Sequence, residues 1–274
     1  MNLKSFTVRT LVALVFGPLI LVLVWLGEFY LFGLILVLVT LCYWEFTSLS
    51  SRKGALAQQY TGEIIGIATL TSLYFFPGHL FLLAIGATLL VLFGEIYRSN
   101  GSPLLNTATT LFGALYFSLL LGCFILIRQL PLKYGLDYHE AGHWIIMMIL
   151  ATWICDTAAY IIGSYFGRHK LIPRISPNKS VEGTVAGFCF AILSTYAYNE
   201  IFTTSISKID AIAIGAIIGI FGQYGDLFES MFKRDAGVKD TSSLIPGHGG
   251  MMDRFDSLTI SAPMVYLYLV YVAL

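Results

Sequence analysis

The chain alternates between long apolar blocks and short polar segments. Nine blocks of about 16 to 23 mostly apolar residues recur along its 274 residues, the third and fourth divided only by Pro77 and Gly78. A helix that rises about 1.5 Å per residue needs about 20 such residues to cross roughly 30 Å of hydrocarbon. The pattern therefore predicts nine transmembrane helices, at about 10–26, 29–46, 61–76, 79–95, 107–128, 144–163, 183–200, 210–232 and 257–274.

The composition agrees with this pattern, since 57% of residues are hydrophobic and 12% are charged, against roughly 25% charged in soluble domains. We therefore predict an all-α polytopic integral membrane protein, with a single membrane domain over residues 1–274. Residues 1–143 would form N-terminal hydrophobic helices, and residues 144–274 would carry the site. The formal net charge is zero, so we expect no nucleic-acid partner.

The N-terminus resembles a signal peptide, because Lys4 and Arg9 precede an apolar run. That run is long and lacks a small-x-small cleavage motif, so we expect an uncleaved first span. The four cysteines lie in apolar spans without metal-type spacing, and we expect them to be small buried hydrophobes. They are Cys42, Cys123, Cys155 and Cys189.

Lysine and arginine residues are unevenly divided between the two sides of the predicted topology. With a cytoplasmic N-terminus, thirteen of the 16 lie on the cytoplasmic side, and Arg128, Lys133 and Lys208 lie on the other. Excess positive charge is typical of the cytoplasmic side of a membrane protein. We therefore expect an external C-terminus and, from the short chain and tails, a bacterial inner (plasma) membrane.

Three carboxylates lie inside apolar spans of the second half, at Asp156, Asp226 and Glu229. A carboxylate at the centre of a span costs about 2.5 to 3.5 kcal/mol, so such residues usually face a polar cavity or a partner. The spacing of Asp226, Glu229, Ser230 and Lys233 places all four on one helical face. We therefore predict a polar cavity that opens toward the cytoplasm.

The first five spans carry hardly any interior charge. Their acidic residues, Glu28, Glu45, Glu63 and Glu95, all lie near predicted helix ends. From these positions their side chains can reach the membrane interface.

Two basic loops border the predicted cavity. The first, Ser164–Gly183, carries four basic residues among turn-forming Pro and Gly. The second, Lys233–Asp256, contains the sequence GHGG, which permits close backbone approach to phosphate oxygens. Asp253 and Asp256 follow it three residues apart and supply hard oxygen ligands near basic groups, as a magnesium-bound polyphosphate requires. The second loop therefore predicts a nucleotide site at the membrane surface.

Each of these features also has an ordinary structural interpretation. Lys233 and Arg234 alone are typical of a positive-inside anchor. The glycines alone are typical of a loop, and the chain has no GxxxxGK(S/T) phosphate-binding motif. The hypothesis of a nucleotide site therefore depends on their occurrence together.

The combination resembles a known family. The segment SMFKRDAGVKDTSSLIPGHGGMMDRFD, Ser230–Asp256, resembles the signature of the phosphatidate cytidylyltransferase family, S-x-φ-K-R-x4-K-D followed by (P/G)-x-H-G-G-φ-x-D-R-φ-D. Two further segments, Asp156–Gly183 and Gly222–Ser230, resemble the same family. Ala158 stands where the family pattern has glycine, and Ser180 stands where threonine is common. The likeness at the level of motifs covers roughly Asp156 to Asp256.

The resemblance implies the reaction of CTP with phosphatidate to give CDP-diacylglycerol and pyrophosphate, a step of phospholipid biosynthesis, at a cytoplasm-facing site. It implies Mg²⁺ as cofactor, with room for K⁺ at the same site. CTP and phosphatidate in the bilayer are the implied partners, and so compact a bundle is compatible with a homodimer.

Matching the signature position by position implies roles for individual residues. The implied metal-binding carboxylates are Asp226 and Asp253. The residues implied to contact phosphates are Lys233, Arg234, Lys239, His248 and Arg254, supported by Asp240 and Asp256. The residues implied to bind substrate are Asp156, Ser176, Lys179, Glu182, Ser230, Gly249 and Gly250.

Two other functions compete with this interpretation. In an ion-coupled transporter, Asp156, Asp226 and Glu229 would form a cation path. The ionisable groups cluster on one side of the predicted membrane, which disfavours a complete path. A CTP-dependent polyprenol or phytol kinase would instead transfer the γ-phosphoryl group to an alcohol, and its product would distinguish it.

Overall fold

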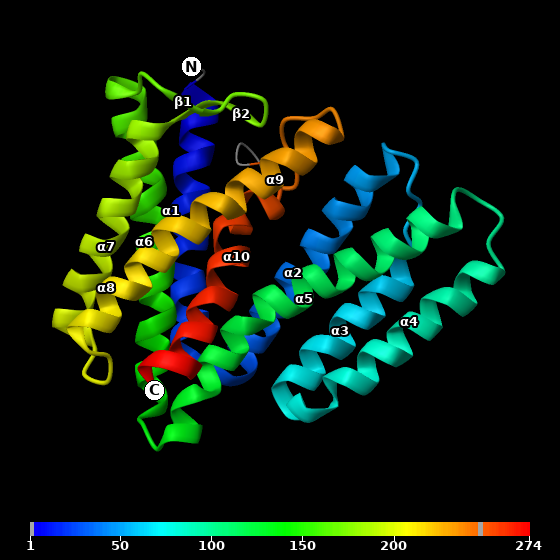
Figure 1. Ribbon diagram of the computed structural model, residues 1–274, viewed down its shortest axis with the longest axis horizontal. Helices are drawn as coiled ribbons and strands as arrows, with labels where there is room; N and C mark the ends of the chain where they lie inside the picture. The colour runs from blue at the N-terminus through cyan, green and yellow to red at the C-terminus, as the bar shows by residue number, and fades with distance from the viewer. Residues whose placement is uncertain (1–2, 246–248) are drawn as a thin grey trace. The chain divides into compact units, whose positions relative to one another are not determined.

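The computed structural model describes the backbone of residues 3–245 and 249–274, with side chains from residue 14 onward (Figure 1). His248 lies outside the described residues. The α-helices are α1 (Leu3–Leu26), α2 (Glu28–Ser51), α3 (Gln59–Phe75), α4 (Leu80–Ile96), α5 (Pro103–Tyr134), α6 (Tyr138–Phe166), α7 (Val181–Phe202), α8 (Lys208–Ile217), α9 (Gln223–Asp235) and α10 (Met252–Tyr268). The shorter elements are η1 (Pro77–His79), β1 (Lys170–Ile172), β2 (Ser176–Ser180), η2 (Ile218–Gly222) and η3 (Leu269–Ala273).

Each predicted span coincides with a helix or a run of joined helices. Within the described ranges, seven of these are long and apolar enough to cross a membrane. The described apolar part of α1, Leu14–Leu26, and the 17 residues of α3 are shorter. The prediction of an all-α integral membrane protein is confirmed, whereas nine crossings and a cytoplasm-facing cavity stay predictions. The break at Pro77 is confirmed, because η1 separates α3 from α4 there.

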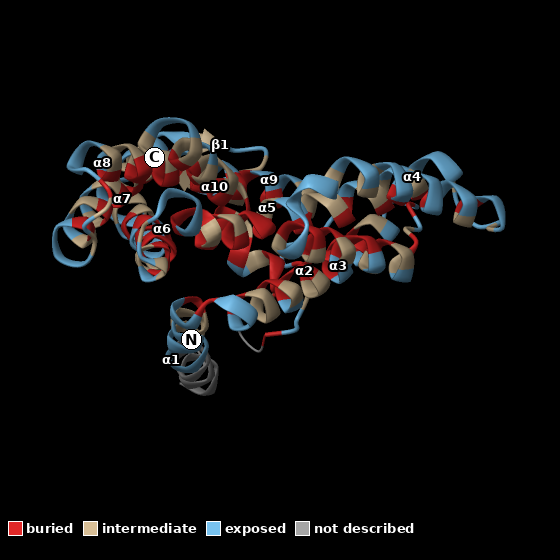
Figure 2. Ribbon diagram, turned by 90° about the horizontal axis from the view of Figure 1, so that it is seen from below, coloured by how far each residue is buried: buried red, intermediate tan, exposed pale blue. Residues whose placement is uncertain are grey.

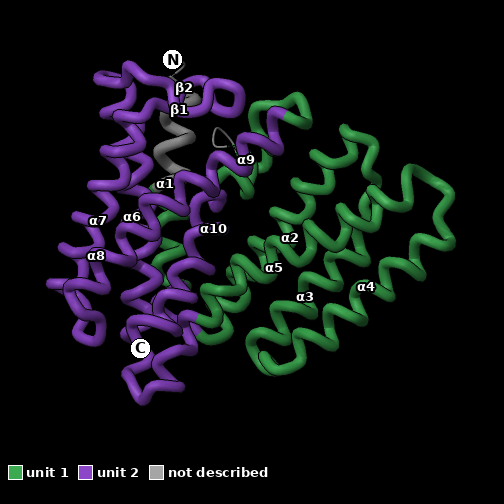
Figure 3. The backbone as a smooth tube through the Cα atoms, in the orientation of Figure 1, with its two compact units in different colours: residues 1–23, 28–126, 235–254 green, residues 24–27, 127–234, 255–274 purple. Residues whose placement is uncertain are grey.

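The chain divides into two compact units (Figure 3). Unit 1 comprises Met1–Leu23, Glu28–Leu126 and Asp235–Arg254, and unit 2 comprises Val24–Gly27, Ile127–Arg234 and Phe255–Leu274. Most of the second basic loop therefore belongs to the same compact unit as α2, α3 and α4. The loop is separated from these helices by more than a hundred residues of sequence.

Unit 1 is built on α2, α3 and α5, where buried residues concentrate, while α4 is mostly exposed (Figure 2). Beside the apolar core lies a buried polar network. Gln58 Nε2 donates to Glu95 Oε2 at 2.9 Å, and Asn106 Nδ2 donates to Glu95 Oε1 at 2.7 Å. Glu95 is therefore buried, and Gln58, Asn106 and Arg98 satisfy its carboxylate inside the unit.

In unit 2, close packing of α6, α7 and α8 depends on small residues. A Cβ added at Gly183 would lie 2.6 Å from the carbonyl oxygen of Ala159, and one at Gly187 would lie 2.9 Å from that of Cys155. Glycine lets helix backbones approach this closely in membranes. The bundle therefore sets the position of α7 and of the loop before it.

The first basic loop, for which only turn-forming residues were predicted, contains a short hairpin. Strands β1 and β2 pair antiparallel, with Lys170 opposite Ser180 and Ile172 opposite Ser176. The Ser180 side chain then caps α7 by accepting a hydrogen bond from Gly183 N at 3.2 Å. The strands are too short and polar to show the alternating pattern that identifies a strand in sequence.

Arg128, at the end of the predicted span 107–128, lies inside α5 and is buried within unit 2. Helix α5 continues to Tyr134, so Arg128 is within the helix, 1% exposed. Its guanidinium donates to the carbonyls of Trp25, at 3.0 Å, and Tyr138, and lies 3.8 Å from the centroid of the Tyr138 ring. Arg128 therefore ties the end of α1 to the start of α6.

The prediction for the cysteines is confirmed at three positions and wrong at one. Cys42, Cys123 and Cys155 are buried, but Cys189 is exposed on α7. An apolar span has a side that packs against protein and a side that faces lipid, and apolar composition does not distinguish them.

Candidate active site

The first part of the candidate site lies at the start of α9 in unit 2. Asp226 Oδ2 forms an ion pair with Lys179 Nζ at 2.6 Å, and Ser230 Oγ donates to Asp226 Oδ1 at 3.2 Å. One turn along, Lys233 Nζ lies 3.2 Å from Glu229 Oε1. The contacts of Asp226 with Ser230 and of Glu229 with Lys233 follow the four-residue spacing that predicted a polar helix face.

Gly225 brings the backbone of α9 directly against α10. A Cβ at this position would lie 2.3 Å from the carbonyl oxygen of Asp256 and 3.0 Å from Ser257 Cα. Only glycine leaves room for this approach. Asp226 and Asp256 are consequently held on adjoining helix segments within unit 2.

The hairpin supplies further groups to this cluster. Lys179 reaches Asp226 from β2, and Arg234 Nε donates to the carbonyl of Ile175 at 3.3 Å, between the two strands. Ser176 begins β2 and is partly buried. The hairpin is thus joined to both ends of α9.

Glu182 orders the backbone that leads into β1. Its carboxylate accepts hydrogen bonds from the backbone N of Arg168 at 3.1 Å and of His169 at 3.2 Å, and lies 2.6 Å from His169 Nδ1. A role of Glu182 in substrate binding stays a prediction. So does that of Asp156, which is exposed on α6.

The second part of the candidate site lies at the start of α10 in unit 1. Asp253 Oδ2 accepts hydrogen bonds from Thr241 N at 2.9 Å and Gly250 N at 2.8 Å, and lies 2.9 Å from Thr241 Oγ1. Gly249 has φ +87°, and a Cβ there would lie 2.8 Å from Asp253 Oδ2. The described glycines of GHGG therefore let the loop close over Asp253.

The remaining described signature residues lie on the surface. Lys239, Asp240 and Arg254 are exposed, as is Arg234 at the end of α9. Exposed basic side chains of this kind are suited to neutralise a polyphosphate.

Glu45 on α2 was not among the predicted site residues. Its carboxylate is 6% exposed and accepts hydrogen bonds from the backbone of Met251 and Met252, at 2.8 and 2.9 Å. Although Glu45 lies near a helix end, the loop before α10 and the first residue of α10 supply the donors to its carboxylate. The one sequence signal was an acidic residue in an otherwise apolar span.

The carboxylates of Asp226 and Asp253 offer the hard oxygen ligands that suit Mg²⁺. No group of three or more His, Cys, Asp or Glu side chains within the described ranges forms a metal cluster. Mg²⁺ in nucleotide enzymes commonly uses one or two carboxylates together with substrate phosphates and waters. The donor chemistry of either aspartate fits that mode of binding.

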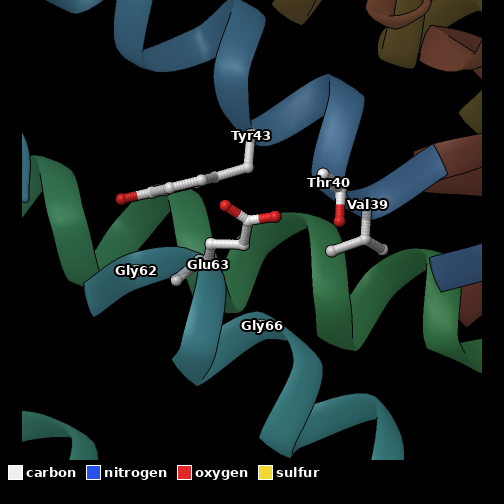
Figure 4. A pocket seen from close by; sticks show the side chains of 7 residues that line it. Val39, Thr40, Tyr43, Gly62, Glu63 and Gly66 are labelled. Carbon is white, nitrogen blue, oxygen red and sulfur yellow. The ribbon is translucent and has the colours of Figure 1, made fainter. Parts of the chain in front are cut away.

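A separate small pocket lies between α2, α3 and α5 in unit 1 (Figure 4). The Glu63 carboxylate lies between Tyr43 and Thr40 there, and Trp44 Nε1 donates to it at 3.2 Å. The pocket is lined by Val39, Thr40, Tyr43, Gly62, Glu63, Gly66 and Ala114. None of the predicted site residues is among them.

The fold and these clusters define a polytopic α-helical membrane protein with carboxylate and basic side chains gathered at helix ends. A profile of the cytidylyltransferase family matches residues 7–272. The chain belongs to this family.

Similar proteins include bacterial enzymes named phosphatidate cytidylyltransferase. The protein of Staphylococcus saprophyticus is 43% identical over 131 residues, covering 48% of this chain and 50% of the relative. That of Bacillus subtilis is 35% identical over 187 residues, covering 68% of this chain and 67% of the relative. The chain thus spans about half the length of the staphylococcal relative and two thirds of the other.

Proposed function

We propose that this protein transfers the cytidylyl group of CTP to phosphatidate and releases pyrophosphate, forming CDP-diacylglycerol. The family membership and the names of the relatives support this activity. The observation that carries it is the ion pair of Lys179 with Asp226, at 2.6 Å. It joins two separate segments of the sequence signature at the end of an apolar helix run.

The reaction needs positioning and charge neutralisation more than acid–base chemistry. A phosphate oxygen of the lipid forms a bond to the α-phosphorus of CTP while the bond to the leaving pyrophosphate breaks. Because the lipid phosphate is ionised at neutral pH, no general base and no covalent nucleophile are required. In-line alignment and electrostatic stabilisation supply the catalysis.

Within this proposal the basic residues bind and orient the phosphates. Exposed Lys239, Arg254 and Arg234 neutralise the polyphosphate of CTP, and Lys179 adds positive charge beside Asp226. Asp226 in unit 2 and Asp253 in unit 1 are each suited to supply carboxylate oxygens to Mg²⁺, which when bound would withdraw charge from the phosphate oxygens.

The membrane location suits the lipid substrate. Phosphatidate keeps its acyl chains in the bilayer while its headgroup reaches polar groups at the helix ends, and CTP arrives from the cytoplasm. We propose a bacterial inner membrane because the similar proteins are bacterial. We propose a cytoplasmic site and N-terminus because Lys and Arg are concentrated on that side of the predicted topology.

The direct test is pyrophosphate release by purified protein in mixed micelles. We expect release that requires CTP, phosphatidate and Mg²⁺ together, with loss of the signal when any one is omitted. A CTP-dependent kinase would yield CDP and a phosphorylated alcohol instead. If no pyrophosphate is released with any of several lipids and metal ions, the proposed activity is wrong, and transport is the next function to assay.

The orientation is tested with reporter fusions. Alkaline phosphatase fused after Leu274 should be active, and the same reporter fused after Lys239 should be inactive. The reason is that alkaline phosphatase reaches its active fold only outside the cytoplasm. A green fluorescent protein at the same two sites should give the opposite pattern. An active phosphatase after Lys239 would contradict the cytoplasmic site.

A further inference from the structure

We infer that Glu45 is a positioning residue for the reaction: its carboxylate holds Thr241 and Ser242 at one point of the loop and Met251 and Met252 at another, and through them keeps Asp253 in the geometry that turnover needs. This inference rests on the proposed function for its kinetic consequences. The contacts of Glu45 with the loop are independent of which reaction the protein catalyses.

The Glu45 carboxylate receives hydrogen bonds from four groups at two separate points of the loop. Ser242 Oγ and Met251 N donate to Oε1, at 2.7 and 2.8 Å. Thr241 Oγ1 lies 2.8 Å from Oε2, and Met252 N donates to the same oxygen at 2.9 Å. One side chain of α2 thereby joins the beginning of the loop to the start of α10.

Glu45 is coupled to Asp253 through two shared neighbours. The Thr241 hydroxyl lies within hydrogen-bond distance of both carboxylates, at 2.8 Å from Glu45 Oε2 and 2.9 Å from Asp253 Oδ2. Gly250, whose N donates to Asp253, packs so closely that a Cβ there would lie 2.4 Å from Glu45 Oε2. A shift of the Glu45 carboxylate would therefore move the groups that orient Asp253.

The contacts require a carboxylate at this position. Met252 is the first residue of α10, and backbone N–H groups at a helix start favour a negative charge. Each carboxylate oxygen of Glu45 lies within hydrogen-bond distance of two of the four donor groups. A glutamine amide has only one oxygen, so its NH₂ group would face the other two donor groups. Because Glu45 is only 6% exposed, its influence passes through the groups that it holds.

The test compares Glu45→Gln with Glu95→Gln. Glu95 is an equally buried carboxylate of unit 1, at 6% exposed, with hydrogen bonds from Gln58 and Asn106 and an ion pair with Arg98 at 3.2 Å. Mutation of a group that hydrogen-bonds a metal-binding carboxylate typically lowers metal affinity or activity by about 10- to 100-fold. We therefore expect kcat of Glu45→Gln to fall by about this factor, with much smaller changes in KM for CTP. Glu95→Gln should lower thermal stability but keep the kcat of the folded enzyme. Equal kcat for both variants and wild type would overturn the inference.

A second readout does not depend on activity. Lys239 is exposed within the loop, so tryptic cleavage after it, followed by mass spectrometry, reports how well the loop is held. Glu45→Gln should be cut faster than wild type and than Glu95→Gln. If wild-type protein releases no pyrophosphate, the proposed function fails, while faster cleavage still supports the anchoring role; unchanged cleavage would contradict it.

If Glu45→Gln does not accumulate, its partners provide the test. Thr241→Val and Ser242→Ala remove the two hydroxyls that contact the carboxylate and leave the backbone donors in place. We expect each to lower kcat, and their combination with Glu45→Asp to be less than additive because the residues act as a unit. Wild-type kcat in both single variants would overturn the inference.

Discussion

Asp226→Asn is expected to lower kcat by about 10²- to 10³-fold, the scale associated with losing one electrostatic contact to a transition state. The substitution keeps the shape of the side chain but removes the charge that pairs with Lys179 at 2.6 Å. Asp226 keeps an exposed fraction of 32% at its side chain, so the variant should still fold and insert. Steady-state kinetics of pyrophosphate release at saturating Mg²⁺ measure the effect.

Asp235→Asn is the matched control, because it lies at the end of the same helix. Asp235 pairs with Lys53 at 3.2 Å on the surface, with side chains 67% and 51% exposed, and exposed pairs contribute little. We expect near wild-type activity from this variant. Near-normal turnover of Asp226→Asn at saturating Mg²⁺ would remove Asp226 from the proposed metal-binding role.

Asp253→Asn should also lose turnover, but it is a less selective probe. Asp253 Oδ2 accepts backbone hydrogen bonds from Thr241 and Gly250. An amide nitrogen in that place would disturb the loop as well as any bound ion. Activity loss in this variant would therefore report both the disturbed loop and the loss of a metal ligand, whereas Asp226→Asn does not remove backbone hydrogen bonds of the loop.

Gly225→Ala should both destabilise the protein and reduce turnover. The added methyl group would lie 2.3 Å from the carbonyl oxygen of Asp256 and 3.0 Å from Ser257 Cα. These are backbone atoms, which cannot rotate away, so α9 and α10 must separate. Overpacking of this kind costs about 1–3 kcal/mol, and a displacement of about 1 Å at the reacting groups can cost about 10²-fold in rate.

Gly86→Ala provides the comparison, since nothing lies within 4 Å of its added Cβ on α4. Alanine is preferred over glycine in a helix by up to about 1 kcal/mol, so this variant should be as stable as wild type or more so. Thermal unfolding in detergent and kcat should be measured on both. Wild-type values for Gly225→Ala would show that α9 and α10 do not pack as closely as this distance indicates.

Much of the fold follows from local sequence. The apolar blocks predicted where the helices lie, including the break at Pro77, because the length and composition of a span are properties of the segment itself. The spacing of Asp226 and Ser230 predicted their shared helix face, which the hydrogen bond of 3.2 Å confirms. The end of the fifth span was predicted too early, at residue 128, because α5 continues to Tyr134.

The sequence by itself thus determined that this is an α-helical membrane protein, and which segments carry carboxylates and basic groups in the pattern of its family. Only the tertiary structure decided which distant groups meet: Lys179 with Asp226, Gly225 with Asp256, and Glu45 with Thr241, 196 positions away. The physical reason is that a carboxylate near a helix end is satisfied equally well by water or by backbone N–H groups of another segment. Its own neighbours in sequence do not distinguish the two, and the packing of the folded chain does.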